Sequence, residues 1–226
     1  MDWPKGIDTL ERTVIATPYD STEMKIQMTQ DRLTPFNCVA ILIDFQARLL
    51  STIDSIDVKT LTENVIGLAR RVSLFDIPAI LTTIGVKTFG GPLLPELRMI
   101  FSNRGPIECA TMSVWEDRRV CRKVEKTGRQ KLVVAGLWTD FCVALSAIQA
   151  LKSGYEVHLV TDACGDLNTR SQDTAIRRMI QAGAISMECR QVLVELQLHE
   201  PLAVPDNSYS SQRKKKKVSL ELSLRQ

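Results

Sequence analysis

The sequence predicts an α/β fold, a three-layer α/β/α sandwich around a mostly parallel sheet. Short apolar runs of strand length alternate along the chain with longer segments of helical apolar spacing, which is the pattern of consecutive βαβ units. Several of the apolar runs, such as residues 132–137, show no alternation, as expected for parallel strands that helices cover on both faces. Right-handed crossovers between such strands place helices on both sides of the sheet.

The first half of the pattern opens with five apolar residues, Val39 to Ile43, that end in Asp44. A run of this length is typical of a buried strand. The expected elements that follow alternate in the same way. They are a strand at 39–44, a helix at about 60–75, a strand at 78–84, a short helix at about 93–101 and a brief strand near 107–111.

The second half continues this alternation after a turn that Gly136 opens. Val143, Ala147 and Leu151 recur at helical spacing beyond it, and Pro201 ends regular structure. The expected elements are helices at 116–127, 141–153, about 171–182 and 190–198, and strands at 131–137, 156–161 and 185–188.

Composition indicates one folded domain at residues 37–200, with an N-terminal extension at 1–36 and a basic, disordered C-terminal tail at 201–226. The chain of 226 residues is long enough for one core to bury roughly 70 to 75% of the surface of an extended chain. No apolar run is long enough to span a bilayer, and the first residues lack the pattern of a secretory signal. We therefore expect a cytoplasmic protein without membrane partners, whose six cysteines are free thiols.

The net charge of +3 is a local excess, because Arg213 to Lys217 alone contribute five positive charges. Such a run is typical of a solvated tail, and a nuclear-import or phosphate-binding role stays open for it. No aromatic residues interleave with these lysines, as a single-strand binding surface would require. The sequence thus argues against a nucleic-acid partner.

Cys142 stands where a buried strand passes into the first turn of a helix that Thr139 or Asp140 can cap. Helix N–H groups and the helix dipole favour a thiolate at such a place, so we expect the pKa of this thiol to be lowered from about 8.5. The alternative is a buried cysteine that serves only in packing.

Asp44 ends an earlier strand of the same predicted sheet. Side chains at the carboxyl ends of parallel strands meet in the crevice where ligands bind, so Asp44 can face Cys142 and accept its proton. The alternative is an aspartate that only caps the next turn. A Cys/His pair is disfavoured, because His158 lies inside a predicted strand and His199 near the tail.

Five motifs in order resemble the isochorismatase-like hydrolase superfamily, specifically its YcaC-related branch of cysteine hydrolases. They are Ile43 to Ala47, Gly91 to Leu97, Trp115 to Asp117, Ala135 to Val143 and Gly154 to Ala163, and the resemblance runs from about Cys38 to Leu198. It implies that Cys142 is the nucleophile and Asp44 the acid/base. It also implies that the N–H groups of Trp138 and Cys142 form the oxyanion hole, with a cis peptide between Leu137 and Trp138.

The chain departs from this family at the third catalytic residue, a Lys or Arg several positions before Trp115. Glu108 and Cys109 stand where the cation is expected. Arg104 is the basic residue that a different backbone route would have to bring in. A glutamate beside Asp44 would raise the pKa of both carboxylates.

Substrate contacts are expected from Gln46, Trp115 and Thr139, and the resemblance places substrate-shaping residues in the loop at 85–94. Gln46 either holds a substrate amide or only ties down a neighbouring loop. Trp115 and Trp138 either wall an apolar pocket or belong to the core. No metal and no cofactor are expected, because the chain has no histidine between Asp44 and Cys142.

These observations predict a cysteine-dependent hydrolase of a small-molecule amide or related C–N bond, which acts through a Cys142 thioester with Asp44 as base. By resemblance the protein forms a homo-oligomer. The alternative from another class is a catalytically impaired family member that acts as an oligomeric scaffold or binding protein, and Glu108 and Cys109 are what favours it.

Overall fold

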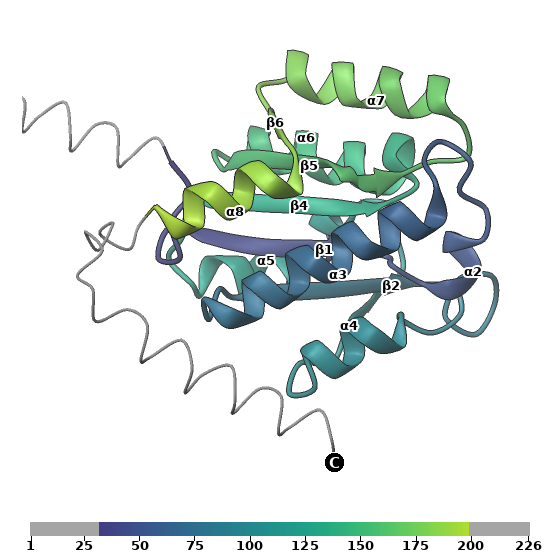
Figure 1. Cartoon of the computed structure of the whole chain (residues 1–226), viewed down its shortest axis with the longest axis horizontal. Coiled ribbons are helices and arrows are strands. Elements are labelled where there is room, and N and C mark those ends of the chain that lie inside the picture. Colours follow the sequence, from purple (N-terminus) through teal and green to yellow (C-terminus); the bar gives the residue numbers. More distant parts are fainter. Residues whose placement is uncertain (1–31, 199–226) are drawn as a thin grey trace, which may run out of the picture. The chain divides into compact units, whose positions relative to one another are not determined.

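Six parallel strands form one sheet in the computed structural model, which describes residues 32–198 (Figure 1). The strands are β1 (Cys38–Ile43), β2 (Ala79–Ile84), β3 (Ile107–Cys109), β4 (Lys131–Leu137), β5 (Glu156–Gly165) and β6 (Ile185–Met187). Their order across the sheet is β3-β2-β1-β4-β5-β6, and all neighbouring pairs are parallel. This topology puts β1 and β4 side by side in the centre.

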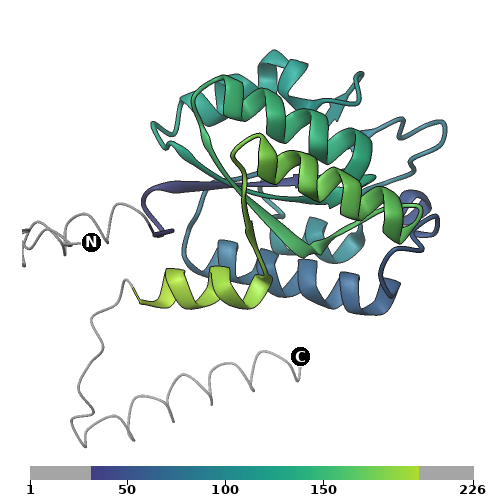
Figure 2. The ribbon, with the colours of Figure 1, turned by 90° about the horizontal axis from the view of Figure 1, so that it is seen from above.

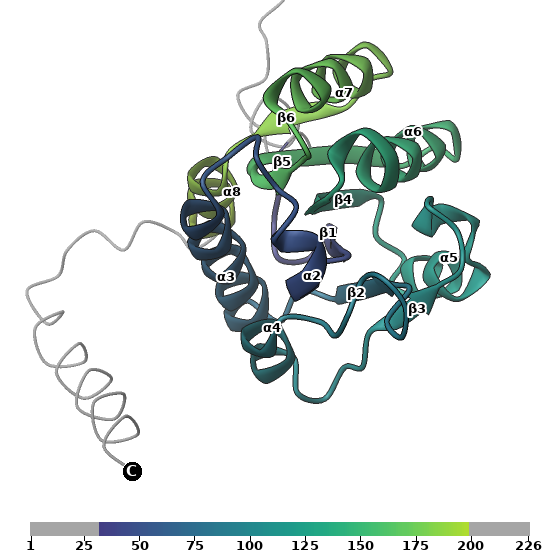
Figure 3. The ribbon, with the colours of Figure 1, turned by 90° about the vertical axis from the view of Figure 1, so that its right-hand side faces the viewer.

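Helices cover both faces of the sheet (Figures 2 and 3). One layer holds α3 (Val58–Leu74), α4 (Pro95–Ile100) and α8 (Cys189–Gln197), and the other holds α5 (Arg118–Glu125), α6 (Ala144–Lys152) and α7 (Thr169–Gln181). Each layer packs on its own buried apolar cluster. The predicted three-layer sandwich is therefore confirmed. Within residues 32–198, no helix combines the length and the apolar character needed to cross a membrane.

Every predicted strand and helix is present. The structure differs from the prediction at the ends of elements and in two short additional elements. The predicted strand near 107–111 stops at Cys109, whereas β5 runs on to Gly165. The short helix α2 (Ala47–Leu50) and the 3-10 turn η1 (Val114–Glu116) were not predicted. Both are too short for an apolar period to reveal them.

The predicted N-terminal extension and C-terminal tail lie almost wholly outside the described residues. Leu33, at the end of that extension, is fully buried, and its backbone N–H donates to Glu195 Oε2 at 2.8 Å. Leu33 therefore packs with the folded core, and the domain bounds of 37–200 stay a prediction.

β1 and β4 approach closely at their carboxyl ends because Gly136 is opposite Ile43. A Cβ atom at Gly136 would lie 2.7 Å from Ile43 Cβ, 2.8 Å from Ile43 O and 2.9 Å from Val143 Cγ2. All three neighbouring atoms belong to the backbone or to stiff β-branched side chains, so they have little freedom to move. The glycine thus sets how near the two central strands lie.

Replacing Gly136 by alanine should lower the free energy of unfolding by about 1 to 3 kcal/mol, since the added methyl overfills this contact. The matched control is Gly67→Ala in α3, where a new Cβ meets nothing within 4 Å. That change should raise stability by about 0.5 to 1 kcal/mol. Urea denaturation of both variants checks the pair, and equal effects at the two positions would contradict the packing argument.

Candidate active site

The chain turns through an uncommon backbone conformation at the end of each central strand. Asp44, directly after β1, has a φ of 56°, and Trp138, directly after β4, has a φ of 53°. Left-handed backbone is rare for residues other than glycine and costs of order 1 to 3 kcal/mol, so it tends to mark functional sites. The two turns lie next to each other because β1 and β4 are paired.

Asp44 is buried at the carboxyl end of β1, with 1% of its surface exposed. Thr82, from β2, donates its hydroxyl to Asp44 Oδ1 at 2.8 Å. Burial raises the pKa of the Asp44 carboxyl, while the hydrogen bonds from Thr82 and from the Cys142 thiol lower it by less. The carboxyl and the thiol therefore interact, as the sequence predicts.

Cys142 is fully buried in a π-helical turn, η2 (Thr139–Val143), that precedes α6. Burial raises the pKa of its thiol, and the negative charge of Asp44, the hydrogen bond with Asp44 and the charge of Asp140 raise it further. The predicted lowering of this pKa is wrong for two reasons. Desolvation and two carboxylates outweigh the helix end, and the Cys142 N–H is already bonded to the Trp138 carbonyl at 2.9 Å.

The predicted cis peptide between Leu137 and Trp138 is also wrong, since all peptide bonds among residues 32–198 are trans. The chain turns from β4 into η2 through the left-handed backbone conformation of Trp138 instead. With the Cys142 N–H donating to the Trp138 carbonyl, the oxyanion hole expected from these two residues is not open in this conformation.

Gln46 fixes the loop at 85–94. It is fully buried, and its amide nitrogen donates to the carbonyls of Ile84 and Gly91, while Oε1 accepts from the N–H of Ile84 at 2.8 Å. All of its amide groups are occupied by backbone. Of the two roles expected for Gln46, these contacts match the tying of a loop.

Thr139 and Trp115, the other residues expected to contact substrate, both make hydrogen bonds within the protein. The hydroxyl of Thr139 is buried and donates to the carbonyl of Gly165 at 3.0 Å. Trp115 packs against Tyr155 in the α6 layer and donates its ring N–H to Ser153 Oγ at 3.0 Å, which matches the core alternative.

Trp138 stands over the edge of the sheet, where its ring stacks on Phe89 with centroids 5.8 Å apart. Its ring N–H donates to Thr52 Oγ1 at 3.1 Å. Trp138 therefore holds the tip of the loop at 85–94 beside the site.

A pocket of about 580 Å³ opens beside the pair. Its lining consists of Ile84, Gly85, Phe89, Glu108, Cys109, Ala110, Met112 and Arg119. Met112 connects the pocket to Cys142, because its sulfur lies 3.9 Å from Cys142 Sγ. Burial raises the pKa of Cys109 to about 12, with the charges of Asp117 and Asp44 adding to the effect. Cys109 is thus near enough to Asp44 to sense its charge, at a position where the sequence led us to expect a cation.

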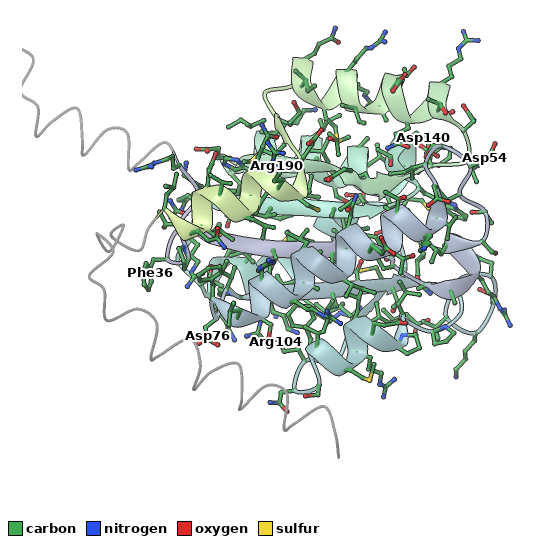
Figure 4. The ribbon with its side chains drawn as sticks, in the orientation of Figure 1. Phe36, Asp54, Asp76, Arg104, Asp140 and Arg190 are labelled. Carbon is green, nitrogen blue, oxygen red and sulfur yellow. The ribbon has the colours of Figure 1, made fainter. Side chains whose placement is uncertain are left out.

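Arg104 does not reach the site. Its guanidinium donates to the carbonyl of Ile77, just before β2 begins, at 3.2 Å. It lies toward the amino ends of the strands, whereas Asp140 lies near their carboxyl ends (Figure 4). The sequence reasoning missed Arg119 as the cation that lines the pocket. The signal was available, because Asp117 is an N-cap residue and Arg119 follows in the first helical turn.

His158 is buried in β5, where its Nε2 lies 2.6 Å from Glu156 Oε1, and it makes no contact with Asp44 or Cys142. This agrees with the prediction that it is not the base. Residues 32–198 contain no group of three or more His, Cys, Asp or Glu side chains arranged to hold a metal ion.

The fold and the position of the pair define a class: an open parallel α/β sandwich with its candidate site at the carboxyl ends of the central strands. Residues 38–191 match the Isochorismatase domain, so the chain belongs to the isochorismatase family of hydrolases.

Known proteins of this family are similar over most of the domain. The probable hydrolase YcaC of Escherichia coli is 35% identical over 73% of this chain and 80% of its own length. Its crystal structure, reported as an octameric hydrolase of unknown specificity, has a TM-score of 0.72 at 35% identity and covers 74% of this chain and 83% of that one. YcaC from Pseudomonas aeruginosa, solved with hexane-2,5-diol and covalent acrylamide, has the same TM-score of 0.72 and identity of 35%, over 74% and 84%. The nicotinamidase of E. coli is 43% identical over 56 residues, 24% of this chain and 26% of its own.

Asp44→Asn should change how stability depends on pH. Burial raises the folded pKa of Asp44 above its unfolded value, so the folded state holds the extra proton between the two values. Wild-type stability relative to Asp44→Asn should therefore fall as pH rises from about 4 toward the folded pKa. Urea denaturation at pH 4 to 8 measures this difference.

The control is Asp57→Asn, because hydrogen bonds from the N–H and hydroxyl of Thr60 lower the pKa of Asp57. Here wild-type stability relative to the variant should be full above about pH 4 and be lost as pH falls through the folded pKa. Parallel stability curves for wild type and Asp44→Asn would show that Asp44 ionises freely.

Proposed function

We propose that this protein is a cysteine-dependent hydrolase of small-molecule amides, with Cys142 as the nucleophile and Asp44 as the base. The observation that carries the proposal is the buried Asp44–Cys142 pair at the carboxyl ends of β1 and β4, next to a pocket of about 580 Å³. A thiol beside a carboxylate is the arrangement that nucleophilic catalysis needs. The partial match to a nicotinamidase supports an amide as the bond cleaved.

The reaction proceeds in two halves. The ionised Asp44 takes the thiol proton as Cys142 Sγ bonds to the carbonyl carbon, and the C–N bond then breaks while Asp44 gives this proton to the leaving amine. Asp44 next takes a proton from water, whose oxygen attacks the thioester carbon. The C–S bond breaks, the carboxylic acid leaves, and the proton returns to Cys142.

The raised pKa values support this order of events. Because burial disfavours both a free thiolate and a free carboxylate, the pair is best described as sharing one negative charge, which moves to the thiol only during attack. A carboxyl with a raised pKa is better matched to a base that works near neutral pH.

The N–H groups of Trp138 and Cys142 remain our proposed oxyanion donors. The Cys142 N–H must then leave the Trp138 carbonyl to which it is bonded here. Strain of about 1 to 3 kcal/mol at the left-handed Trp138 favours such a change of the turn. Acrylamide reacts with nucleophilic side chains, so covalent acrylamide in the P. aeruginosa relative supports a reactive residue in this family.

Three variants test the proposal on a panel of small amides, with ammonia or amine release as the assay. Cys142→Ser should bring turnover to background, and Asp44→Asn should lower kcat by about 10² to 10⁴-fold because the base is lost. Cys164→Ser is the control, since Cys164 is likewise fully buried but packs in β5. A wild type without turnover or acyl adduct on any amide would instead favour the binding-protein alternative.

We further propose that the protein is a cytoplasmic homo-oligomer, in keeping with the octameric E. coli relative and with six free cysteines. Light scattering on purified protein should give a mass that is a multiple of 25.3 kDa. Deleting residues 205–226 should leave this mass ratio unchanged, because the tail is expected to lie outside the folded core. A monomer at micromolar concentration would contradict the proposal.

A further inference from the structure

The pocket beside Cys142 contains two charged side chains, and only one of them is neutralised. Arg119 makes a two-pronged ion pair with Asp117, with Nε 3.0 Å from Oδ1 and Nη2 2.6 Å from Oδ2. Its Nη2 also donates to the backbone carbonyl of Glu108 at 2.6 Å. Asp117 is the main cause of the raised pKa of Arg119, and Glu108 the smallest. The guanidinium is therefore committed to Asp117.

The Glu108 carboxylate has no such partner. Its Oε1 accepts one long hydrogen bond, from the backbone N–H of Val86 at 3.3 Å, and it takes part in no ion pair within residues 32–198. Lys87 and Arg48 belong to the same region but do not line the pocket. Arg119, its partner Asp117 and Glu108 together carry one net negative charge, and Glu108 is the member of this group that lines the pocket without an ion-pair partner.

The rest of the pocket suits an organic cation. Phe89 lies in its wall, 44% exposed. One face of its ring stacks on Trp138, and an aromatic face attracts an ammonium or guanidinium group, so the face turned away from Trp138 is the one that a cation would use. Ile84, Ala110 and Met112 supply apolar surface for the carbon part of a small molecule. Met112 covers the thiol, and its flexible side chain can move aside when a ligand enters.

We infer that the site selects positively charged substrates, with Glu108 and the face of Phe89 holding the cation while the scissile carbonyl reaches Cys142. This inference rests on the proposed function and names its substrate class: small amides that carry an ammonium or guanidinium group. In this inference Glu108 binds the cation of the substrate, at the position where the family resemblance expects a lysine or arginine. A substrate that carries a carboxylate would be repelled by Glu108 and would find Arg119 already paired with Asp117.

Methanethiosulfonate reagents test the inference, because the same reactive group is available in a neutral, a cationic and an anionic compound. The Cys142 sulfur bonds to the reagent's thiol sulfur, methanesulfinate leaves with the electron pair of the broken S–S bond, and the thiol proton passes to Asp44 or solvent. The reagents are the neutral methyl, the cationic trimethylammonioethyl and the anionic sulfonatoethyl compound. Rates at the Cys142 peptide are measured by mass spectrometry and divided by rates with free cysteine.

The corrected rate for the cationic reagent should exceed that for the anionic one by about 5- to 10-fold at low salt, and 0.5 M salt should reduce the ratio. Glu108→Gln should bring the ratio close to one. Glu63→Gln is the matched control, since Glu63 is exposed on α3 in the opposite layer and should leave the ratio unchanged.

The outcomes separate this inference from the proposed function. Failure of the neutral reagent to label Cys142 in the folded protein would overturn both, because the pocket would not lead to a reactive thiol. Labelling by the neutral reagent without a charge preference would overturn only the inference. A faster anionic reagent whose advantage disappears in Arg119→Gln would also overturn it, and would assign recognition to Arg119.

Discussion

The register between β1 and β4 is the constraint on which the rest of the site depends. Ile43 is opposite Gly136, so two parallel chains leave the sheet at the same height and turn side by side. A side chain larger than hydrogen at Gly136 would push the strands apart. The Asp44 turn and the Cys142 turn meet because this one contact is tight, and the loop that Gln46 ties is positioned from the same strand end.

Burial then decides how the two groups behave. A carboxyl and a thiol that are both removed from water cannot both carry charge at low cost. Among residues 32–198, only Thr82 and the thiol itself give hydrogen bonds to the Asp44 carboxyl. No cation contacts Asp44 among residues 32–198, so the pair must balance its own charge. This differs from a site in which a lysine or arginine holds the carboxylate ionised, and under the proposed mechanism it ties the chemistry to the movement of a single proton.

The fold was predictable because its signals are local. An apolar run such as 132–137 and the helical spacing after it need no knowledge of the partner strand. The pairing of Asp44 with Cys142 followed from the rule that strand ends meet. The pKa of Cys142 did not, because it depends on how deeply η2 is buried and on the charge of Asp44, and a local window of sequence around Cys142 contains neither. The same holds for Gln46, whose partners Ile84 and Gly91 are about 40 residues away.

Among residues 32–198, β3 lies at the edge of the sheet and is paired on one side only, with β2. Glu108, Cys109 and the two pocket residues that follow belong to this edge, whereas Asp44 and Cys142 follow the two central strands. The surface that a ligand first meets is therefore attached to the most independent part of the sheet. Substitutions on an edge strand can change this surface while Asp44 and Cys142 keep their spacing. Protein engineers can use the same edge to redirect the enzyme without rebuilding its centre.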